Sequence, residues 1–154
     1  SPNFLDVSDA DWALSFAVNV LGMARVARNV IPVMQSQGGG VIVNIASLCG
    51  LRNIPPTPPC YTASKFAVIG LTKSLAKEVA DTGIRLSSVA PAVIHTPMLD
   101  QVSQETIDYM VSKIPVGRTG TPQEVAALVH YLSSEECSFT TGACFDISGG
   151  RATY

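Results

Sequence analysis

The sequence predicts an α/β fold in which a three-stranded parallel sheet is covered by helices, giving three layers. Three short, mostly apolar runs at residues 41–46, 84–90 and 143–147 have the composition of buried parallel strands. Longer segments between them space their apolar side chains at helical intervals. Alternating helices and strands are typical of a parallel sheet with helices packed on its faces. At 154 residues, the chain has the size of a single domain.

The first helix is predicted over residues 9–36. Ser8 can cap its start, with Asp11 three residues later. Apolar side chains then recur on one face of this segment, at Trp12, Phe16, Val20, Met23, Ala27, Ile31 and Met34. Pro32 lies inside this span and predicts a kink, because proline cannot donate the helical hydrogen bond.

The middle of the chain is predicted to contain a loop, a helix and a strand. A proline-rich loop covers residues 53–60, and the second helix follows over 61–80. Gly83 ends that helix, since glycine is favoured just beyond a helix end. The strand 84–90 comes next and is broken by Pro91.

The last third of the chain is predicted to hold two further helical segments. Residues 97–114 are expected to form a lid-like helical segment between two prolines. The third main helix begins after Thr121 and runs to about residue 133, because Pro122 suits the first turn of a helix. The strand 143–147 then completes the sheet.

Composition and charge exclude several functions. The formal net charge of −2 gives no reason to expect a nucleic-acid or anionic-membrane partner. No run of about 18 uncharged apolar residues is present, so a soluble, cytoplasmic protein is expected. His95 and His130 have no metal-ligand spacing to a cysteine, and no metal site is expected. The cysteines form no C-x-x-C pair and are expected to be reduced and buried: Cys49, Cys60, Cys137 and Cys144.

Tyr61 and Lys65 are candidate catalytic residues. They lie four residues apart on a predicted helix, so their side chains emerge from one face. Tyr109 and Lys113 have the same spacing, and spacing alone therefore indicates little. However, Tyr61 follows a buried strand that ends near Ser47, and parallel sheets place their sites at the carboxyl ends of strands.

These three side chains could move a proton at a substrate oxygen. A phenol has a pKa near 10, which a nearby Lys65 ammonium would lower. The Ser47 hydroxyl could hold the substrate oxygen. Alternatively, Ser47 merely ends a strand and Lys65 is solvated. Asn19 lies near the buried stripe of the first helix. It is either a fourth member of the site or a structural residue whose amide has its hydrogen bonds satisfied.

Several motifs together resemble the classical short-chain dehydrogenase/reductase family. They are F-A-V-N-V-L-G around Asn19, N-I-A-S-L-C-G around Ser47 and Y-T-A-S-K at 61–65. Residues 85–98, 118–126 and 146–150 resemble later family segments. The resemblance extends over nearly the whole chain and implies the carboxyl-terminal, catalytic half of a Rossmann-like domain.

The resemblance implies an NAD- or NADP-dependent oxidoreductase that acts on a secondary alcohol or carbonyl. Tyr61 would be the general acid/base, and Lys65 would also bind the nicotinamide ribose. Ser47 would donate to the substrate oxygen, and Asn19 would hold a water in a proton relay to Lys65. The nicotinamide and its neighbouring phosphate would be lined by Pro91, Ala92, Ile94 and Thr96.

The family's amino-terminal dinucleotide-binding half is absent from residues 1–154. Without its glycine-rich turn, only the nicotinamide end of the cofactor would be held. We therefore expect this sequence to be part of a complete enzyme, with the chain by itself inactive. The residue that selects NAD or NADP lies in the missing half, and the strand 41–46 is expected to have an unpaired edge.

The expected lining of the substrate site is apolar, which suits a carbonyl on a modest hydrophobic body. The same side chains could instead simply pack the core. The candidates are Leu48, Cys49, Val93 and Met98, with Leu51, Ile54, Leu99 and Met110. Substrate hydroxyls could be met by Thr57, Gln101 and His95.

Two readings without catalysis stay open. The resemblance implies a homo-oligomer that forms through the helices at about 9–36 and 61–80. In one reading without catalysis, the chain is a pseudoenzyme that uses this surface to assemble with other subunits. The run Pro55–Pro59 could also serve as a ligand for a proline-recognition module.

Overall fold

A computed structural model describes residues 3–153 and contains a three-stranded parallel sheet in the order β1-β2-β3. The strands are β1 (Gly40–Ile45), β2 (Ile84–Pro91) and β3 (Cys144–Ile147). Gly40 pairs with Ile84, and Pro91 pairs with Ile147. The predicted α/β class and all three strands are confirmed, with strand ends within one residue of the prediction.

The first helical region runs without a break from Asp9 to Ser36 but is not uniform. It consists of α1 (Asp9–Phe16), a π-helical turn (Ala17–Leu21) and α2 (Gly22–Ser36). The Ser8 hydroxyl accepts from the Asp11 amide, and the Asp11 carboxylate accepts from the Ser8 amide, so the predicted cap is present. The irregularity lies in the π-helical turn, and α2 continues through Pro32.

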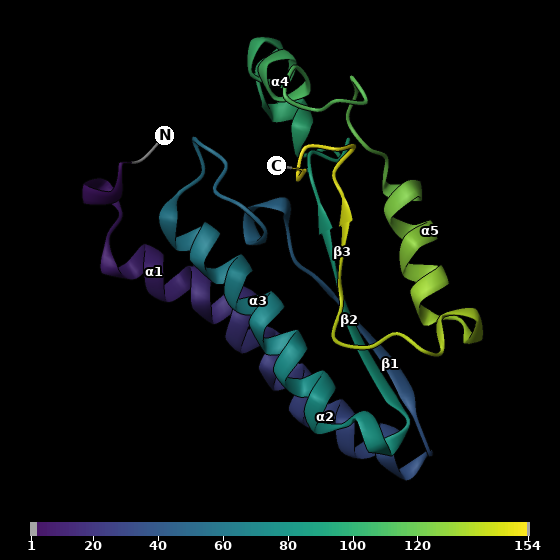
Figure 1. Cartoon of the computed structure of the whole chain (residues 1–154). Helices are drawn as coiled ribbons and strands as arrows, with labels where there is room; N and C mark the ends of the chain where they lie inside the picture. Colours follow the sequence, from purple (N-terminus) through teal and green to yellow (C-terminus); the bar gives the residue numbers. More distant parts are fainter. Residues whose placement is uncertain (1–2, 154) are drawn as a thin grey trace.

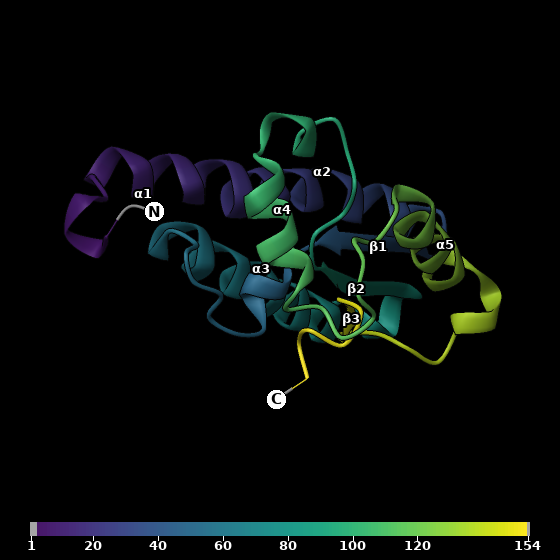
Figure 2. The ribbon, with the colours of Figure 1, turned by 90° about the horizontal axis from the view of Figure 1, so that it is seen from above.

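Helices cover the two faces of the sheet (Figure 1). α3 (Pro59–Glu78) and α2 lie on one face, and α5 (Pro122–Ser133) lies on the other. α4 (Gln104–Val111) sits beyond the carboxyl ends of the strands, as the view from above also shows (Figure 2). The lid-like segment expected at 97–114 is shorter than predicted, because Ser103 caps a new helix by accepting from the Thr106 amide.

The core is divided between the two faces of the sheet. On the α3 side, Val68, Ile84 and Leu86 are almost completely buried. On the α5 side, Val89 of β2 packs with Leu132 and Cys137. The sequence was expected to bury all four cysteines, but Cys144 is only partly buried, because it lies on the short edge strand β3.

Arg85 links the sheet to the end of α5. Its guanidinium donates to the backbone oxygens of Leu132, Ser134 and Cys137 at 2.8–3.0 Å. The last carbonyls of a helix lack partners within the helix, and one side chain of β2 therefore satisfies the end of α5.

Two apolar surfaces are exposed within residues 3–153. The outer edge of β1 pairs with no other described strand, as expected for the strand 41–46. The continuous helix Asp9–Ser36 also exposes a stripe of large side chains, namely Leu14, Val18, Leu21, Val26 and Val33. Among the described helices, it alone is long and apolar enough to cross a bilayer, but length and composition do not separate a membrane span from a helix that packs on protein.

Candidate active site

The candidate site lies where β1 ends and α3 begins. Ser47 follows β1 by two residues, and its hydroxyl accepts from the Cys49 amide at 3.1 Å, which fixes a short 3₁₀ turn over Leu48–Gly50. α3 begins at Pro59, so Tyr61 lies in its first turn and Lys65 in the next. The carboxyl end of a parallel strand and the start of a helix therefore meet at one point.

The structure brings Ser47, Tyr61 and Lys65 together. The Ser47 side chain lies near enough to the Tyr61 phenol to lower its pKa. Lys65 Nζ lies 5.6 Å from the centroid of the Tyr61 ring and donates to the Ile45 backbone oxygen at 3.1 Å. Lys65 is buried, so the alternative that this side chain is simply solvated does not hold.

Burial controls the charge state of the two titratable groups. It raises the pKa of Tyr61 above its usual value of 10.0, and the nearby Ser47 side chain only partly offsets this effect. Burial likewise lowers the pKa of Lys65. We expected the Lys65 ammonium to lower the phenol pKa, but the pKa of Tyr61 is raised, because desolvation by burial is the largest effect on this phenol.

Asn19 is held at the site by a residue that the sequence analysis missed. Asn19 Nδ2 donates to Ser64 Oγ at 2.9 Å, and Ser64 Oγ donates to the Tyr61 backbone oxygen at 2.7 Å. Ser64 is completely buried and directly precedes Lys65. The π-helical turn contains Asn19, so a local irregularity of the helix coincides with a contact to the segment of α3 that carries Tyr61 and Lys65.

A cavity of about 200 Å³ opens beside Ser47 and Tyr61. Of the expected substrate-lining residues, Leu48, Cys49 and Val93 lie in its wall, together with Ile54, Thr57 and Met110. Met98 was expected there, but its side chain is 77% exposed and lies outside the cavity. Leu51, Leu99, His95 and Gln101 also lie outside the wall.

Five further residues of the wall were not expected from the sequence, and two of them are Pro55 and Pro56 of the proline-rich loop. Thr106 and Tyr109 come from α4, and Arg151 follows β3. The i, i+4 spacing of Tyr109 and Lys113 was the only sequence signal for this part of the wall. Tyr109 therefore belongs to the cavity, although its spacing to Lys113 alone gave it no role.

The expected cofactor residues lie along the end of β2 and the loop that follows. Pro91 and Ala92 line the same cavity as Tyr61. Ile94 lines a neighbouring cavity of about 210 Å³ on the α5 side, which also contains Ala92. Thr96 lies in neither wall and accepts a backbone hydrogen bond from Leu99.

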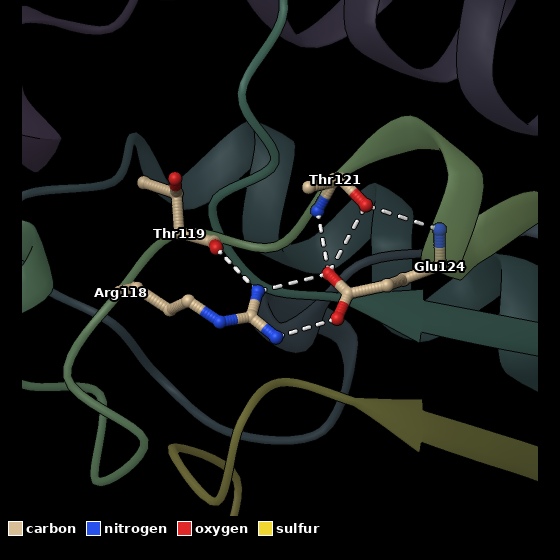
Figure 3. Close-up of polar contacts among 4 residues, drawn as sticks. All are labelled: Arg118, Thr119, Thr121 and Glu124. Atoms are coloured by element: carbon tan, nitrogen blue, oxygen red, sulfur yellow. Dashed lines mark hydrogen bonds and ion pairs between the residues drawn. The ribbon is translucent and has the colours of Figure 1, made fainter.

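The loop before α5 is fixed by one ion pair (Figure 3). Arg118 donates to both carboxylate oxygens of Glu124, at 2.6 and 3.0 Å. Glu124 also accepts from the Thr121 amide at 2.8 Å, and these bonds lower its pKa to about 2. Gly120, in the same loop, bridges to Ile94, so the ion pair holds one wall of the neighbouring cavity.

A larger hollow of about 730 Å³ lies at the opposite end of the sheet. Its wall includes Gly38, Gly40 and Arg85, at the amino ends of β1 and β2. Its wall contains neither Tyr61 nor Lys65, the clustered titratable residues described above. Within residues 3–153, no group of three histidine, cysteine or acidic side chains could hold a metal ion. The smaller cavity beside Tyr61 is therefore the better candidate for an active site.

Comparisons with known proteins identify the family of this chain. The protein family described as enoyl-(acyl carrier protein) reductase matches residues 1–152. A 2-dehydro-3-deoxy-L-rhamnonate dehydrogenase (NAD(+)) from Sphingomonas sp. (strain SKA58) is 48% identical over 137 residues, which are 89% of this chain and 55% of that protein.

Two solved structures have nearly the same fold. The 3-oxoacyl-[acyl-carrier protein] reductase from Brucella melitensis ATCC 23457 superposes with a TM-score of 0.93 at 35% identity, over 97% of this chain and 56% of that one. ElxO with NADP bound gives a TM-score of 0.93 at 32% identity, over all of this chain and 63% of that one.

The chain therefore belongs to the short-chain dehydrogenase/reductase family of Rossmann-fold oxidoreductases. The names of these relatives describe dehydrogenases and reductases; one name includes NAD(+), and one of the solved structures has NADP bound. The chain spans somewhat more than half of their length.

Proposed function

We propose that the protein interconverts a secondary alcohol and a carbonyl by hydride transfer with NAD or NADP. The observation that carries the proposal is the joint position of Ser47, Tyr61 and Lys65 beside one cavity, in a chain of this family. We assign Tyr61 as the general acid/base and Ser47 as the donor that orients the substrate oxygen. Asn19, bonded to Ser64, is assigned to a proton relay toward Lys65.

The protonation state of Tyr61 fits its role in carbonyl reduction. Because burial raises its pKa, the phenol is protonated near neutral pH and can donate to a carbonyl oxygen as negative charge develops there. Ser47 can donate a second hydrogen bond to the same oxygen. In the oxidation direction the phenol must first lose its proton, and a Lys65 ammonium stabilises the phenolate.

The residues present fit the nicotinamide end of a dinucleotide. Tyr61 and Lys65 provide a hydroxyl and an amine that can bond ribose hydroxyls, and Pro91 and Ala92 provide an open, mostly apolar wall. When bound, the cofactor supplies or accepts the hydride. We assign Pro91, Ala92, Ile94 and Thr96 to its neighbourhood. Relatives name both NAD(+) and NADP, so the choice stays open.

We also propose that the protein forms a homo-oligomer through the outer faces of α1, α2 and α3. Leu14, Val18 and Val26 are each more than 60% exposed on the continuous helix Asp9–Ser36, and Phe66 of α3 is 47% exposed. Such an apolar face is expected to be covered in solution. The four free cysteines fit a cytoplasmic location.

The apolar face also supports a second candidate function, in which the chain only assembles with other subunits. Titration with NADH and NADPH separates the two functions. We expect weak binding to residues 1–154 alone and saturable binding to a chain extended upstream, because the pyrophosphate needs a glycine-rich turn that is not in this sequence. An extended chain that binds neither cofactor would favour assembly.

Replacing Tyr61 tests the catalytic proposal directly. Tyr61→Phe in the natural protein should lower kcat by about 10²- to 10⁴-fold, the usual contribution of general acid/base catalysis. Cofactor affinity and melting temperature should change little. Tyr131→Phe is the matched control, because Tyr131 is exposed on α5 and lines no part of the cavity beside Tyr61. Equal activities of the two variants would refute the assignment of Tyr61.

A further inference from the structure

The cavity beside Tyr61 continues into a second hollow whose wall is basic. This outer hollow has a volume of about 290 Å³, and its three charged side chains are Arg52, Lys113 and Arg151. The two hollows have four wall residues in common, namely Ile54, Pro55, Tyr109 and Arg151. A bound molecule could therefore touch Tyr61 at one end and the basic side chains at the other.

The three positive charges of the outer hollow have no negative partner in the part of the chain that the structure describes. No aspartate or glutamate lies in the wall of either hollow. Among residues 3–153, the ion pair that the structure contains joins Arg118 to Glu124, and neither of these residues lines the outer hollow. In the part of the chain that the structure describes, these three cations give the outer hollow a local positive field, although Arg52 also lines a separate hollow with Asp146.

The cations come from three separate segments, and a hydrogen bond joins the segments of Arg52 and Arg151. Arg52 follows the 3₁₀ turn after Ser47, and its Nη1 donates to the Arg151 backbone oxygen at 3.3 Å. Lys113 follows α4, and its Nζ lies 5.2 Å from the centroid of the Tyr109 ring. The Tyr109 ring thus stands between the cavity and the ammonium group, where it also benefits from a cation–π contact.

We propose that the outer hollow binds an anionic group of the substrate, so that the substrate is a carbonyl or alcohol that also carries a carboxylate or phosphate. The inference rests on the proposed function, because it assumes that the reacting carbon lies beside Ser47 and Tyr61. The inner cavity has the volume of about seven waters, at about 30 Å³ each, so the reacting end of the substrate is small. Guanidinium groups recognise carboxylates and phosphates through paired hydrogen bonds.

This inference changes the expected substrate. The sequence analysis favoured a carbonyl on a modest hydrophobic body, because the predicted lining was apolar. The inner wall does contain apolar residues such as Leu48 and Val93, but Arg151 lines both hollows. We infer a short substrate with its carbonyl at the inner end and its negative charge at the outer end.

The test compares charged and uncharged substrates in the natural protein with its cofactor. Linear oxo-carboxylates with different distances between the two groups are assayed beside their methyl esters. We expect a free carboxylate of suitable length to have a KM at least tenfold below that of its ester. Arg151→Gln and Arg52→Gln should each lower the preference for the carboxylate over its ester by about tenfold. This is the size of the effect of one lost charge-assisted hydrogen bond. KM for the ester should rise much less than KM for the free carboxylate.

Two controls separate the possible failures. Arg28→Gln removes an exposed charge from α2, away from the site, and should leave both KM values unchanged. Succinate, used as a probe, should inhibit the parent protein competitively and the Arg52/Arg151 double variant about 100-fold more weakly. If esters and acids are turned over equally and succinate does not discriminate, the anion site is refuted while the proposed function stands. If no carbonyl is reduced and Tyr61→Phe has no effect, the proposed function itself fails.

A further arm identifies the source of the negative charge. The coenzyme A thioester of an oxo acid places phosphates, rather than a carboxylate, beyond the reacting carbonyl. If the arginine variants raise KM for the thioester alone, the hollow binds a carrier phosphate and the anion site is supported. If they raise KM for the free acid alone, the anion is the substrate's own carboxylate.

Discussion

Gly50 is the position at which the packing of the candidate site can be tested most sharply. It ends the 3₁₀ turn after Ser47 and faces α3 at Lys65. A Cβ added at Gly50 would lie 2.6 Å from the Lys65 backbone oxygen and 2.8 Å from its carbonyl carbon. Both are backbone atoms of a helix, so neither can rotate away. Gly50→Ala should therefore push the turn and the helix apart.

The size of the effect follows from these distances. Ordinary contact begins at 3.4 Å, so the two segments must separate by about 0.8 Å, from 3.4 − 2.6. Overpacking of this kind costs about 1–3 kcal/mol of unfolding free energy. At about 2–4 °C per kcal/mol for a chain of this size, the melting temperature should fall by about 2–12 °C. Separating Ser47 from Tyr61 and Lys65 by nearly 1 Å should also lower kcat by about 10²-fold.

Gly70 provides the matched control for Gly50. It lies on α3, as Lys65 does, but a Cβ there would meet nothing within 4 Å. Gly70→Ala should stabilise the protein by about 0.5–1 kcal/mol, because alanine loses less backbone entropy in a helix. Differential scanning calorimetry and steady-state kinetics measure both variants. A Gly50→Ala protein that melts and turns over like the parent would refute the close packing of the turn on α3.

The remaining predictions concern Asn19 and Glu124. Asn19→Ala should lower the unfolding free energy, measured by denaturant titration, by about 0.5–1.5 kcal/mol, because the hydrogen bond to buried Ser64 is lost. As a control, Asn29→Ala at an exposed position should change the unfolding free energy by no more than about 0.5 kcal/mol. Equal effects of the two variants would show that the hydrogen bond to Ser64 contributes nothing. The pKa of Glu124 is lowered from 4.5 to about 2, so its stabilising effect is complete above pH 4.5 and is lost as the pH falls toward 2. The difference in melting temperature between the parent and Glu124→Gln should therefore shrink as the pH falls over that range. Glu136→Gln, the control, should melt as the parent does. A difference between the parent and Glu124→Gln that stays constant with pH would contradict the ionic role of Glu124.

The fold could be predicted from the sequence wherever one local pattern decides it. The strands at 41–46 and 84–90 are apolar and rich in β-branched residues, and no helical pattern competes with them. α3 begins at Pro59, two residues earlier than predicted, because proline occupies the first turn readily. The π-helical turn at Ala17–Leu21 could not be predicted, since its apolar spacing also suits a regular helix.

The candidate site was predictable in its identity but not in its electrostatics. The order and spacing of Ser47, Tyr61 and Lys65 carried the family resemblance. The raised pKa of Tyr61 depends on how deeply the phenol is buried, and no spacing reveals that. The same holds for the basic hollow, because Arg52 and Arg151 lie 99 residues apart in sequence and meet only in the folded chain.

The π-helical turn also determines what the long first helix can contact. It accommodates one residue more than a regular turn, which rotates everything after it by about 100° around the helix axis. α1 accordingly packs on the helix α3, whereas α2 packs on the strands β1 and β2. Removing a single residue from Ala17–Leu21 would restore a regular helix, but it would turn one of these two halves away from its partner. The extra residue thus lets one helix serve two differently oriented docking faces.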